Sequence, residues 1–192
     1  MISDAVVIEE SGNEPERFAA LFDRHAPYIH RYLTRRVGRE VAGDLLDETF
    51  MAAFRKRGRY DRACPDARPW LYGIATNLVS LHYRAEMRQD RLRQTAGPAP
   101  DVPDLAERAV VHLTAQATRS ALAGALASIA RKDRDVLLLI AWEDLSYAEV
   151  SRALAIPVGT VRSRLHRART KLRQALASTG VSAIYEEIMT NE

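Results

Sequence analysis

Residues 145–173 read LSYAEVSRALAIPVGTVRSRLHRARTKLR, and they contain the clearest structural signals in the sequence. Ser146 and Glu149 have the three-residue spacing of a capping box, in which each side chain bonds an amide at the start of a helix. That helix should end before Pro157, because proline disfavours helical geometry in the residue that precedes it. Pro157 can then open a second helix, since the first helical residue needs no amide hydrogen. We therefore predict two helices joined by a tight corner, which is the outline of a helix-turn-helix.

The second predicted helix has one apolar stripe and a strongly basic remainder. From residue 159 to residue 173 it carries six lysines and arginines and no acid. These charges repel one another, and a polyanion would relieve the repulsion. A solvated basic face is the usual alternative, but the capped helix and the corner in front of it favour nucleic-acid binding. The apolar residues recur at i, i+4, i+7 and i+11, which predicts one buried face: Val161, Leu165, Ala168 and Leu172.

Two groups of side chains on this helix have different expected roles. Residues in the first turns of such a helix reach base edges, and the spacing i, i+1, i+4, i+5 puts four of them on one outward face. We predict base contacts from Arg162, Ser163, His166 and Arg167. Contacts to phosphates supply affinity without sequence information, and we predict them for Thr160, Arg164, Arg169, Lys171 and Arg173.

Composition sets limits on the class of protein. The chain has 192 residues, of which 47% are hydrophobic and 28% charged, enough for one domain or two small ones with their own cores. Its net charge is only +3, yet residues 131–173 hold ten basic and five acidic side chains, a local net charge of +5. Cys64 is the single cysteine, so neither an internal disulfide nor a cysteine-based zinc site is expected.

No short motif of catalysis, of membrane insertion or of secretion is evident. The sequence has no membrane-length apolar run and no signal pattern at its N-terminus, so we expect a cytoplasmic protein. It also lacks a nucleophile with its base, a phosphate-binding loop and a carboxylate pair. We therefore expect no enzymatic activity, no metal and no cofactor.

The N-terminal half predicts three helices after a mobile tail at residues 1–15. Apolar periodicity indicates helices over about 17–38 and 41–54, with Gly38 as the stop between them. Asp44, Asp47 and Glu48 form an acidic face on the second of these, for which solubility alone would be a sufficient reason. The third helix begins near Trp70, which we expect in the core.

An irregular loop, YDRACPDARP at residues 60–69, precedes that third helix and follows a cluster of basic residues at 55–59. Tyrosine and tryptophan beside arginines are suited to single-stranded nucleic acid, because bases stack on rings while guanidinium groups contact phosphates. Aromatic residues at helical spacing are more often core residues. The roles of Tyr60 and Tyr83 therefore stay open.

A proline-rich segment separates the two halves. Residues 94–104 read QTAGPAPDVPD and predict a linker, which we extend to residue 116. Further helices are expected from residue 105 to the opening motif, and residues 177–192 form a tail to which we assign no role. No strand pattern or internal repeat is apparent. The predicted fold is all-α, with two small helical domains at 16–93 and 117–176 joined by a flexible linker.

Four segments together resemble the extracytoplasmic-function group of bacterial RNA polymerase sigma factors, in the sigma-70 family. DLLDETFMAAF at 44–54 and WLYGIATN at 70–77 are similar to signatures of the family's region two. LSYAEVSRAL at 145–154 and IPVGTVRSRLHRARTKLR at 156–173 follow the pattern of region four almost residue by residue. The resemblance implies a two-domain promoter-recognition protein.

The resemblance also implies roles for particular residues. Docking on the clamp helices of the largest polymerase subunit would involve Asp44, Leu45, Asp47, Glu48 and Phe50. Capture of a flipped base in the minus-ten element would involve Tyr60, Asp61, Arg62, Asn77 and Arg84. The minus-thirty-five element would be read by the four base-contacting positions named above, with region four near the flap of the second-largest subunit. Many relatives are held inactive by an anti-sigma factor, although no motif here identifies one.

Four positions depart from the family pattern. Leu81 stands where Asp or Asn is frequent, and Ala130 replaces a frequent proline, which leaves open whether the helix runs on there. Asp144 and Ala155 replace frequent glycines; aspartate tolerates a left-handed backbone better than alanine does. Two other functions remain alternatives: a stand-alone helix-turn-helix regulator of duplex DNA, and a helical adaptor or RNA-binding protein. Neither gives a role to residues 44–77.

Overall fold

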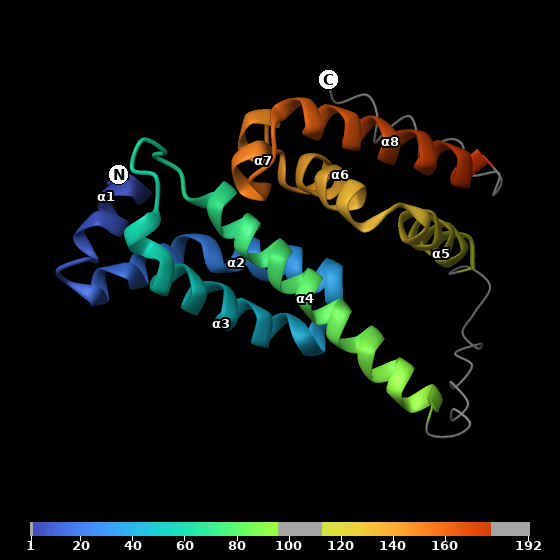
Figure 1. Ribbon diagram of the computed structural model, residues 1–192, viewed down its shortest axis with the longest axis horizontal. Coiled ribbons are helices and arrows are strands. Elements are labelled where there is room, and N and C mark those ends of the chain that lie inside the picture. Colours follow the sequence, from blue (N-terminus) through green and yellow to red (C-terminus); the bar gives the residue numbers. More distant parts are fainter. Residues whose placement is uncertain (1, 96–112, 178–192) are drawn as a thin grey trace. The chain divides into compact units, whose positions relative to one another are not determined.

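A computed structural model describes residues 2–95 and 113–177, and Figure 1 traces them as helices and connecting turns, with no strand in these two ranges. The predicted all-α class is therefore confirmed. The described residues form two compact units, 2–95 with 148–156, and 113–147 with 157–177. Most of the predicted linker and the C-terminal tail lie outside the described residues, and the domain boundaries stay a prediction.

The first unit is built around three long helices that pack on one another. They are α2 (Ala19–Val37), α3 (Arg39–Lys56) and α4 (Arg68–Thr95). Shorter elements complete the unit: α1 (Asp4–Glu10), η1 (Pro15–Phe18), η2 (Arg57–Arg59) and α7 (Tyr147–Leu154). The apolar core of the three long helices includes Leu21, Ile29, Leu33, Ala42, Leu45, Phe50, Ala53, Leu71, Ala75 and Val79.

The stop between α2 and α3 lies where the sequence predicts it. Gly38 has φ 82°, a left-handed conformation that glycine adopts without steric cost, and its amide donates to the Thr34 carbonyl at 3.0 Å. The turn ends α2 and lets α3 fold back against it.

Buried polar contacts fix how α2 and α4 lie against each other. The Tyr32 hydroxyl is 2.8 Å from the Thr76 hydroxyl and accepts a hydrogen bond from Arg36 at 2.6 Å. The Tyr83 hydroxyl donates to the Arg36 carbonyl, which answers the question left open for that tyrosine. The rings of Tyr32 and Tyr72 meet edge to face with centroids 5.3 Å apart. These contacts hold the residues of α4 in one register.

The prediction of a mobile N-terminal tail at residues 1–15 is wrong. Ser3 caps α1 by accepting from the Val6 amide at 3.5 Å, and the helix buries Ala5, Val7 and Ile8. A seven-residue helix is shorter than the window over which apolar periodicity can be read. Its order comes from tertiary contacts that the sequence pattern does not display.

The second unit contains α5 (Leu113–Ser128), α6 (Arg131–Glu143) and α8 (Val158–Ala177), with α8 packed on both of the others. The predicted stripe of α8 is buried in full, and Leu176 extends it by another turn. Ala130 is extended, with ψ 133°, and its carbonyl accepts from the amides of Asp133 and Arg134 at 2.9 Å. The helix therefore breaks before residue 131 without the frequent proline.

The corners that flank α7 use left-handed residues. Asp144 ends α6 with φ 51°, and Ala155 ends α7 with φ 51°, at the two positions where glycine is frequent in the family. Ser146 lies directly before Tyr147, the first residue of α7, as the capping pattern requires. Pro157 precedes α8 instead of opening it, and its carbonyl accepts from the Thr160 and Val161 amides at 2.8 and 3.1 Å. The predicted start of this helix was one residue early.

Candidate polymerase and nucleic-acid interfaces

The acidic face of α3 is exposed, whereas its apolar members are mostly covered. Asp44, Asp47 and Glu48 are all exposed, but Leu45 and Phe50 are each only 6% exposed. Of the five residues predicted for docking, the three acids can therefore meet a partner directly. Leu45 belongs to the core, and Phe50 lines a groove beside the acids.

That groove lies between the start of α2 and the end of α3. It has a volume of about 490 Å³, and Asp47 stands on its border. The Phe22 and Phe50 rings meet at 4.8 Å between centroids, and Phe18 and Phe54 at 5.3 Å. Phe22 and Met51 remain 38% and 52% exposed, so apolar surface adjoins the acidic face. Sequence reasoning missed Met51 as a surface residue, although its spacing of i+4 from Asp47 places both on one side of α3.

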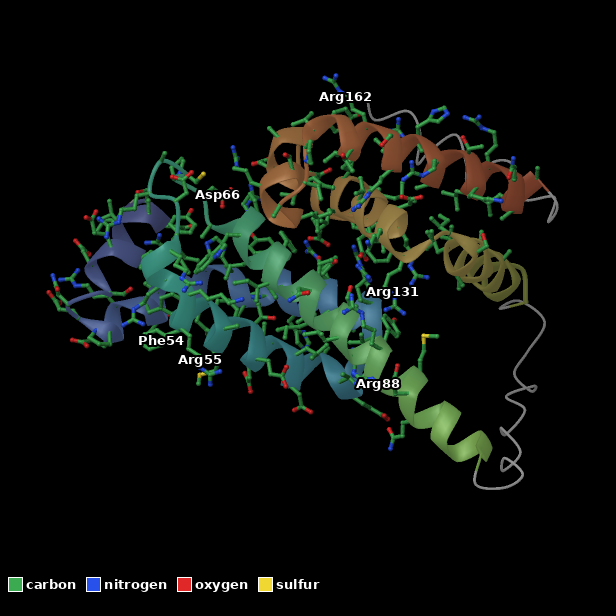
Figure 2. All side chains as sticks on the ribbon, in the orientation of Figure 1. Phe54, Arg55, Asp66, Arg88, Arg131 and Arg162 are labelled. Atoms are coloured by element: carbon green, nitrogen blue, oxygen red, sulfur yellow. The ribbon has the colours of Figure 1, made fainter. Side chains whose placement is uncertain are left out.

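The loop before α4 forms a small pocket. It is lined by Tyr60, Asp61, Cys64, Asp66 and Trp70, and Figure 2 shows Asp66 at the end of the loop where α4 begins. The Asp61 carboxylate accepts from the Ala63 amide at 3.0 Å, and the Tyr60 hydroxyl donates to the Cys64 carbonyl at 2.7 Å. These local bonds give the loop a defined shape.

Tyr60 is a wall of this pocket and not a free stacking platform. Its ring is buried and lies 5.0 Å from that of Trp70, which is itself half-buried. Burial raises the pKa of the Tyr60 hydroxyl, and the nearby thiol and carboxyl groups raise it further, so the group stays protonated. Arg62 is exposed and donates to Glu9 of α1 at 2.7 Å. Tyr60 therefore forms part of the pocket wall with a buried ring, whereas Arg62 presents a positive charge at the surface of the loop.

Two further predicted residues of the minus-ten group lie on one stripe of α4. Asn77 and Arg84 are exposed and seven residues apart, and Trp70 precedes Asn77 by another seven. Seven residues are nearly two helical turns, so the stripe begins at the pocket and runs along α4. Arg88, whose guanidinium donates to the Arg84 carbonyl at 3.3 Å, extends it (Figure 2). Helical spacing thus places Asn77 and Arg84 on the side of α4 that begins at Trp70 in the pocket, and Arg88 is an addition to the predicted set.

The outward face of α8 presents the residues predicted to read bases. Arg162, Ser163 and His166 are exposed, and Figure 2 shows Arg162 projecting from the first part of α8. The Ser163 hydroxyl donates to the Thr160 carbonyl at 3.1 Å. Lys171 and Arg173 are exposed, whereas Thr160, Arg164 and Arg169 are partly buried at the flanks of the helix. The helix thus presents base-contacting candidates near its start and most of its charge further along.

Arg167 is held by an acid from another helix. Its Nε and Nη2 donate to the two carboxylate oxygens of Asp133, on α6, at 3.0 and 2.9 Å. The Asp133 side chain is 11% exposed and that of Arg167 is 58% exposed. The carboxylate of the pair is therefore buried, while the guanidinium is accessible to solvent. Asp133 was missed because 34 residues separate it from its partner.

Among the residues that the structure describes, Asp4, His25 and Asp66 form a cluster with ligand types that could bind a metal. Each brings one candidate atom within 4.8 Å of the others. The Asp4 oxygens already accept hydrogen bonds from Arg24, His25 and the Ala67 amide at 2.8–2.9 Å. Burial alone would raise the pKa of Asp4, but the bonds from His25, Ala67 and Arg24 lower it to about 2. The adjacent guanidinium would repel a cation, so this cluster is better suited to holding segments of the chain together.

Comparison with protein families gives matches over both units. The model of Sigma-70 region 2 matches residues 21–89, and the model of Sigma-70 region 4 matches residues 119–172. These two regions define a sigma factor of the sigma-70 class. None of the described helices is long and apolar enough to cross a membrane.

Individual relatives narrow the class. The chain is 34% identical to RNA polymerase sigma factor CarQ of Myxococcus xanthus over 84% of this chain and 90% of that protein. It is 30% identical to ECF RNA polymerase sigma factor SigL of Mycobacterium tuberculosis over 85% and 90% of the two chains. The chain belongs to the extracytoplasmic-function sigma factors, which direct RNA polymerase to promoters, and this family is not known as enzymatic.

Solved structures agree on the fold. CnrH, solved in complex with the cytosolic domain of CnrY, has a TM-score of 0.65 and 22% identity, over 91% of this chain and 97% of that one. RpoE from Bartonella quintana, solved with the anti-sigma factor NepR, has a TM-score of 0.58 and 19% identity, over 83% and 96%.

Proposed function

We propose that this sigma factor docks on core RNA polymerase through the acidic face of α3 and reads a promoter at two places. The minus-ten element would be captured by the loop pocket and the α4 stripe, and the minus-thirty-five element by α8. The protein itself performs no chemistry in this proposal and acts in the cytoplasm. The observation that carries it is the exposure of Arg162, Ser163, His166 and Arg167 on one face of α8, in a chain whose relatives are RNA polymerase sigma factors.

Docking has an electrostatic and an apolar component. Asp44, Asp47 and Glu48 present negative charge to the clamp helices of the largest subunit, which would need basic residues at this site. Phe22 and Met51 add exposed apolar area beside the acids, and burial of such area contributes about 25 cal/mol per Å². Charge would direct the encounter, and the groove would supply affinity. Region four would lie near the flap of the second-largest subunit.

An anti-sigma factor is a further proposed partner. CnrH and RpoE of Bartonella quintana were each solved with a second protein, CnrY and the anti-sigma factor NepR respectively. The groove beside Asp47 is a surface that such a protein could cover in competition with polymerase. The stand-alone regulator is not favoured, because the matched family consists of polymerase subunits.

The function is tested by transcription of a promoter library with purified core polymerase, in the presence and absence of this chain. We expect new starts that depend on the chain and share two upstream sequence elements. A free chain that selects a duplex site while no start depends on it would support the stand-alone regulator instead.

The docking surface is tested by the double substitution Asp47→Lys and Glu48→Lys. Reversal of two exposed charges should weaken binding to core polymerase by about tenfold, because the new lysines would then face the basic residues expected on the clamp helices. Glu86→Lys, which reverses an exposed acid on α4, is the matched control and should leave the affinity unchanged. Binding is measured by titrating labelled chain with core polymerase, and unchanged affinity of the double variant would exclude this face.

A further inference from the structure

The N-terminal helix α1 holds the loop that lines the pocket. The Asp4 amide donates to the Pro65 carbonyl at 3.1 Å, and the Asp4 carboxylate accepts from the Ala67 amide at 2.9 Å. One residue thus bonds the loop on both sides of Asp66, a pocket-lining residue. Residue 67 is also the last residue before α4, so these bonds fix the point at which the loop becomes helix.

The same carboxylate is anchored to α2. Arg24 donates to one oxygen of Asp4 at 2.9 Å, and His25 lies 2.8 Å from the other. Arg24 also donates to the Ile2 carbonyl at 2.9 Å, which secures the residues before α1. Asp4 therefore joins three segments that are distant in sequence: α1, α2 and the loop.

Burial makes this junction rigid. The Asp4 side chain is only 8% exposed, and hydrogen bonds to a buried carboxylate are roughly twice as strong as bonds between neutral groups. Loss of the carboxylate would also leave the buried Ala67 amide without its acceptor, which is costly in itself. The exposed pair of Arg62 and Glu9 adds a second link between loop and α1, but exposed pairs contribute little.

We propose that Asp4 is a positioning residue that holds the loop in the shape that accepts a flipped base. This inference rests on the proposed function of the loop in minus-ten recognition. Asp4 does not line the pocket and acts through the loop backbone. A pocket that selects one base needs its polar groups held in fixed positions, since a displaced loop would leave hydrogen bonds to the base unmade. The selectivity for that base is therefore the property that Asp4 controls.

The test uses the full chain assembled with core polymerase and a pool of single-stranded DNA decamers with random sequence. Bound decamers are sequenced to obtain the enrichment of each base at each position. Wild type is compared with Asp4→Ala and Asp4→Asn, and Glu10→Ala is the matched control, because Glu10 is on α1 and pairs with Arg17, away from the loop. The Asn variant keeps the size of the side chain and one acceptor oxygen.

We expect wild type to enrich one base at one position. Asp4→Ala should reduce that enrichment by about fivefold, the equivalent of roughly one net hydrogen bond, and Asp4→Asn by less. Glu10→Ala should match wild type. Amide hydrogen exchange of the free chain should rise over residues 61–67 in the Asp4 variants, while exchange in α2 and α3 stays unchanged. A general loss of structure would affect all of these segments alike.

Three results would overturn the inference, and each has a different meaning. Equal enrichment in wild type and Asp4→Ala would show that the loop keeps its shape without Asp4. Loss of polymerase binding and increased exchange throughout α2 and α3, even in Asp4→Asn, would make Asp4 a residue of general stability. If wild-type complex enriches no base at any position, the proposed role of the loop fails and the inference fails with it.

Discussion

Arg167 reaches the outward face of α8 with one edge of its guanidinium already occupied. Asp133 accepts from Nε and Nη2, which leaves both hydrogens of Nη1 and one of Nη2 available. Those remaining donors form the end of the guanidinium, which can still pair with two acceptors of guanine. In the proposed function, Asp133 would therefore select which edge of Arg167 meets a base, and it would limit the orientations of that side chain.

Substitution of Asp133 by alanine should weaken discrimination between DNA sequences. Without the carboxylate, Arg167 can contact any nearby phosphate. Removal of a negative charge also strengthens binding to DNA of every sequence. We expect the ratio of specific to random duplex affinity to fall by about tenfold, in line with the 1–3 kcal/mol that a bidentate base contact provides. The measurement is a competition titration at fixed salt between the selected minus-thirty-five duplex and random duplex.

Arg167→Lys gives the matched comparison, because lysine keeps the charge but cannot pair bidentately. If Asp133 acts through Arg167, the two substitutions should not be additive in the double variant. A rise in the specificity ratio of Asp133→Ala would instead mean that the carboxylate masks Arg167 and that the pair must open before DNA binds.

At the scale of helices and corners, backbone conformation at residue 155 is the point of strain. Ala155 has φ 51°, where a side chain costs about 1–2 kcal/mol, and glycine would adopt this conformation freely. Part of the gain is offset because glycine has more freedom in the unfolded chain. Ala155→Gly should therefore raise the free energy of unfolding by about 0.5–1 kcal/mol, measured by urea denaturation.

The control for this corner is Ala153→Gly, two residues earlier and inside α7. Glycine within a helix is destabilising by up to about 1 kcal/mol relative to alanine, and Ala153 lies in the last turn of α7, so the two substitutions should have opposite signs. Asp144→Gly should stabilise less than Ala155→Gly, because aspartate tolerates the left-handed region better. Equal destabilisation by Ala153→Gly and Ala155→Gly would contradict the left-handed assignment of residue 155.

Elements that depend on interactions between residues close in sequence could be predicted, and those that depend on distant contacts could not. The stop at Gly38, the start of α7 after Ser146 and the buried stripe of α8 depend on residues within a few positions, and sequence reasoning found all three. The order of α1 depends on Asp4 reaching residues 24, 25 and 67, and the orientation of Arg167 depends on Asp133. Such contacts span between 20 and 63 residues, and no local period records them.

The same distinction applies to the candidate site. Asp44, Asp47 and Glu48 are exposed as the spacing predicts, because helical periodicity alone decides which side they take. Tyr60 was assigned to base capture through resemblance, yet its ring is buried against Trp70 and its hydroxyl bonds the Cys64 carbonyl. The identity of an aromatic residue does not reveal whether its face is covered, and only the packing of the loop decides this.

At the level of the whole molecule, the proposed function gives each of the two units its own DNA-reading surface. The α8 surface can bind duplex through phosphate and base contacts, without any change in the DNA. The loop pocket requires an unstacked base, and extrusion of a base costs a few kcal/mol. The free chain has no further partner to offset that cost. Polymerase would offset it by binding both units and the surrounding DNA at once.

We therefore expect the free chain to bind a promoter duplex weakly and to leave the minus-ten element closed. Permanganate, which oxidises unpaired thymines, should modify the minus-ten region only when core polymerase is also present. Affinity of the free chain should decrease steeply with salt, because several basic side chains of α8 are predicted to contact phosphates. A promoter preassembled with an unpaired minus-ten bubble removes the extrusion cost and should bind the free chain more tightly than the closed duplex. Equal affinity for bubble and duplex would show that the loop pocket contributes no binding energy outside the polymerase complex. Permanganate modification of the minus-ten region by the free chain alone would contradict the prediction that melting requires polymerase.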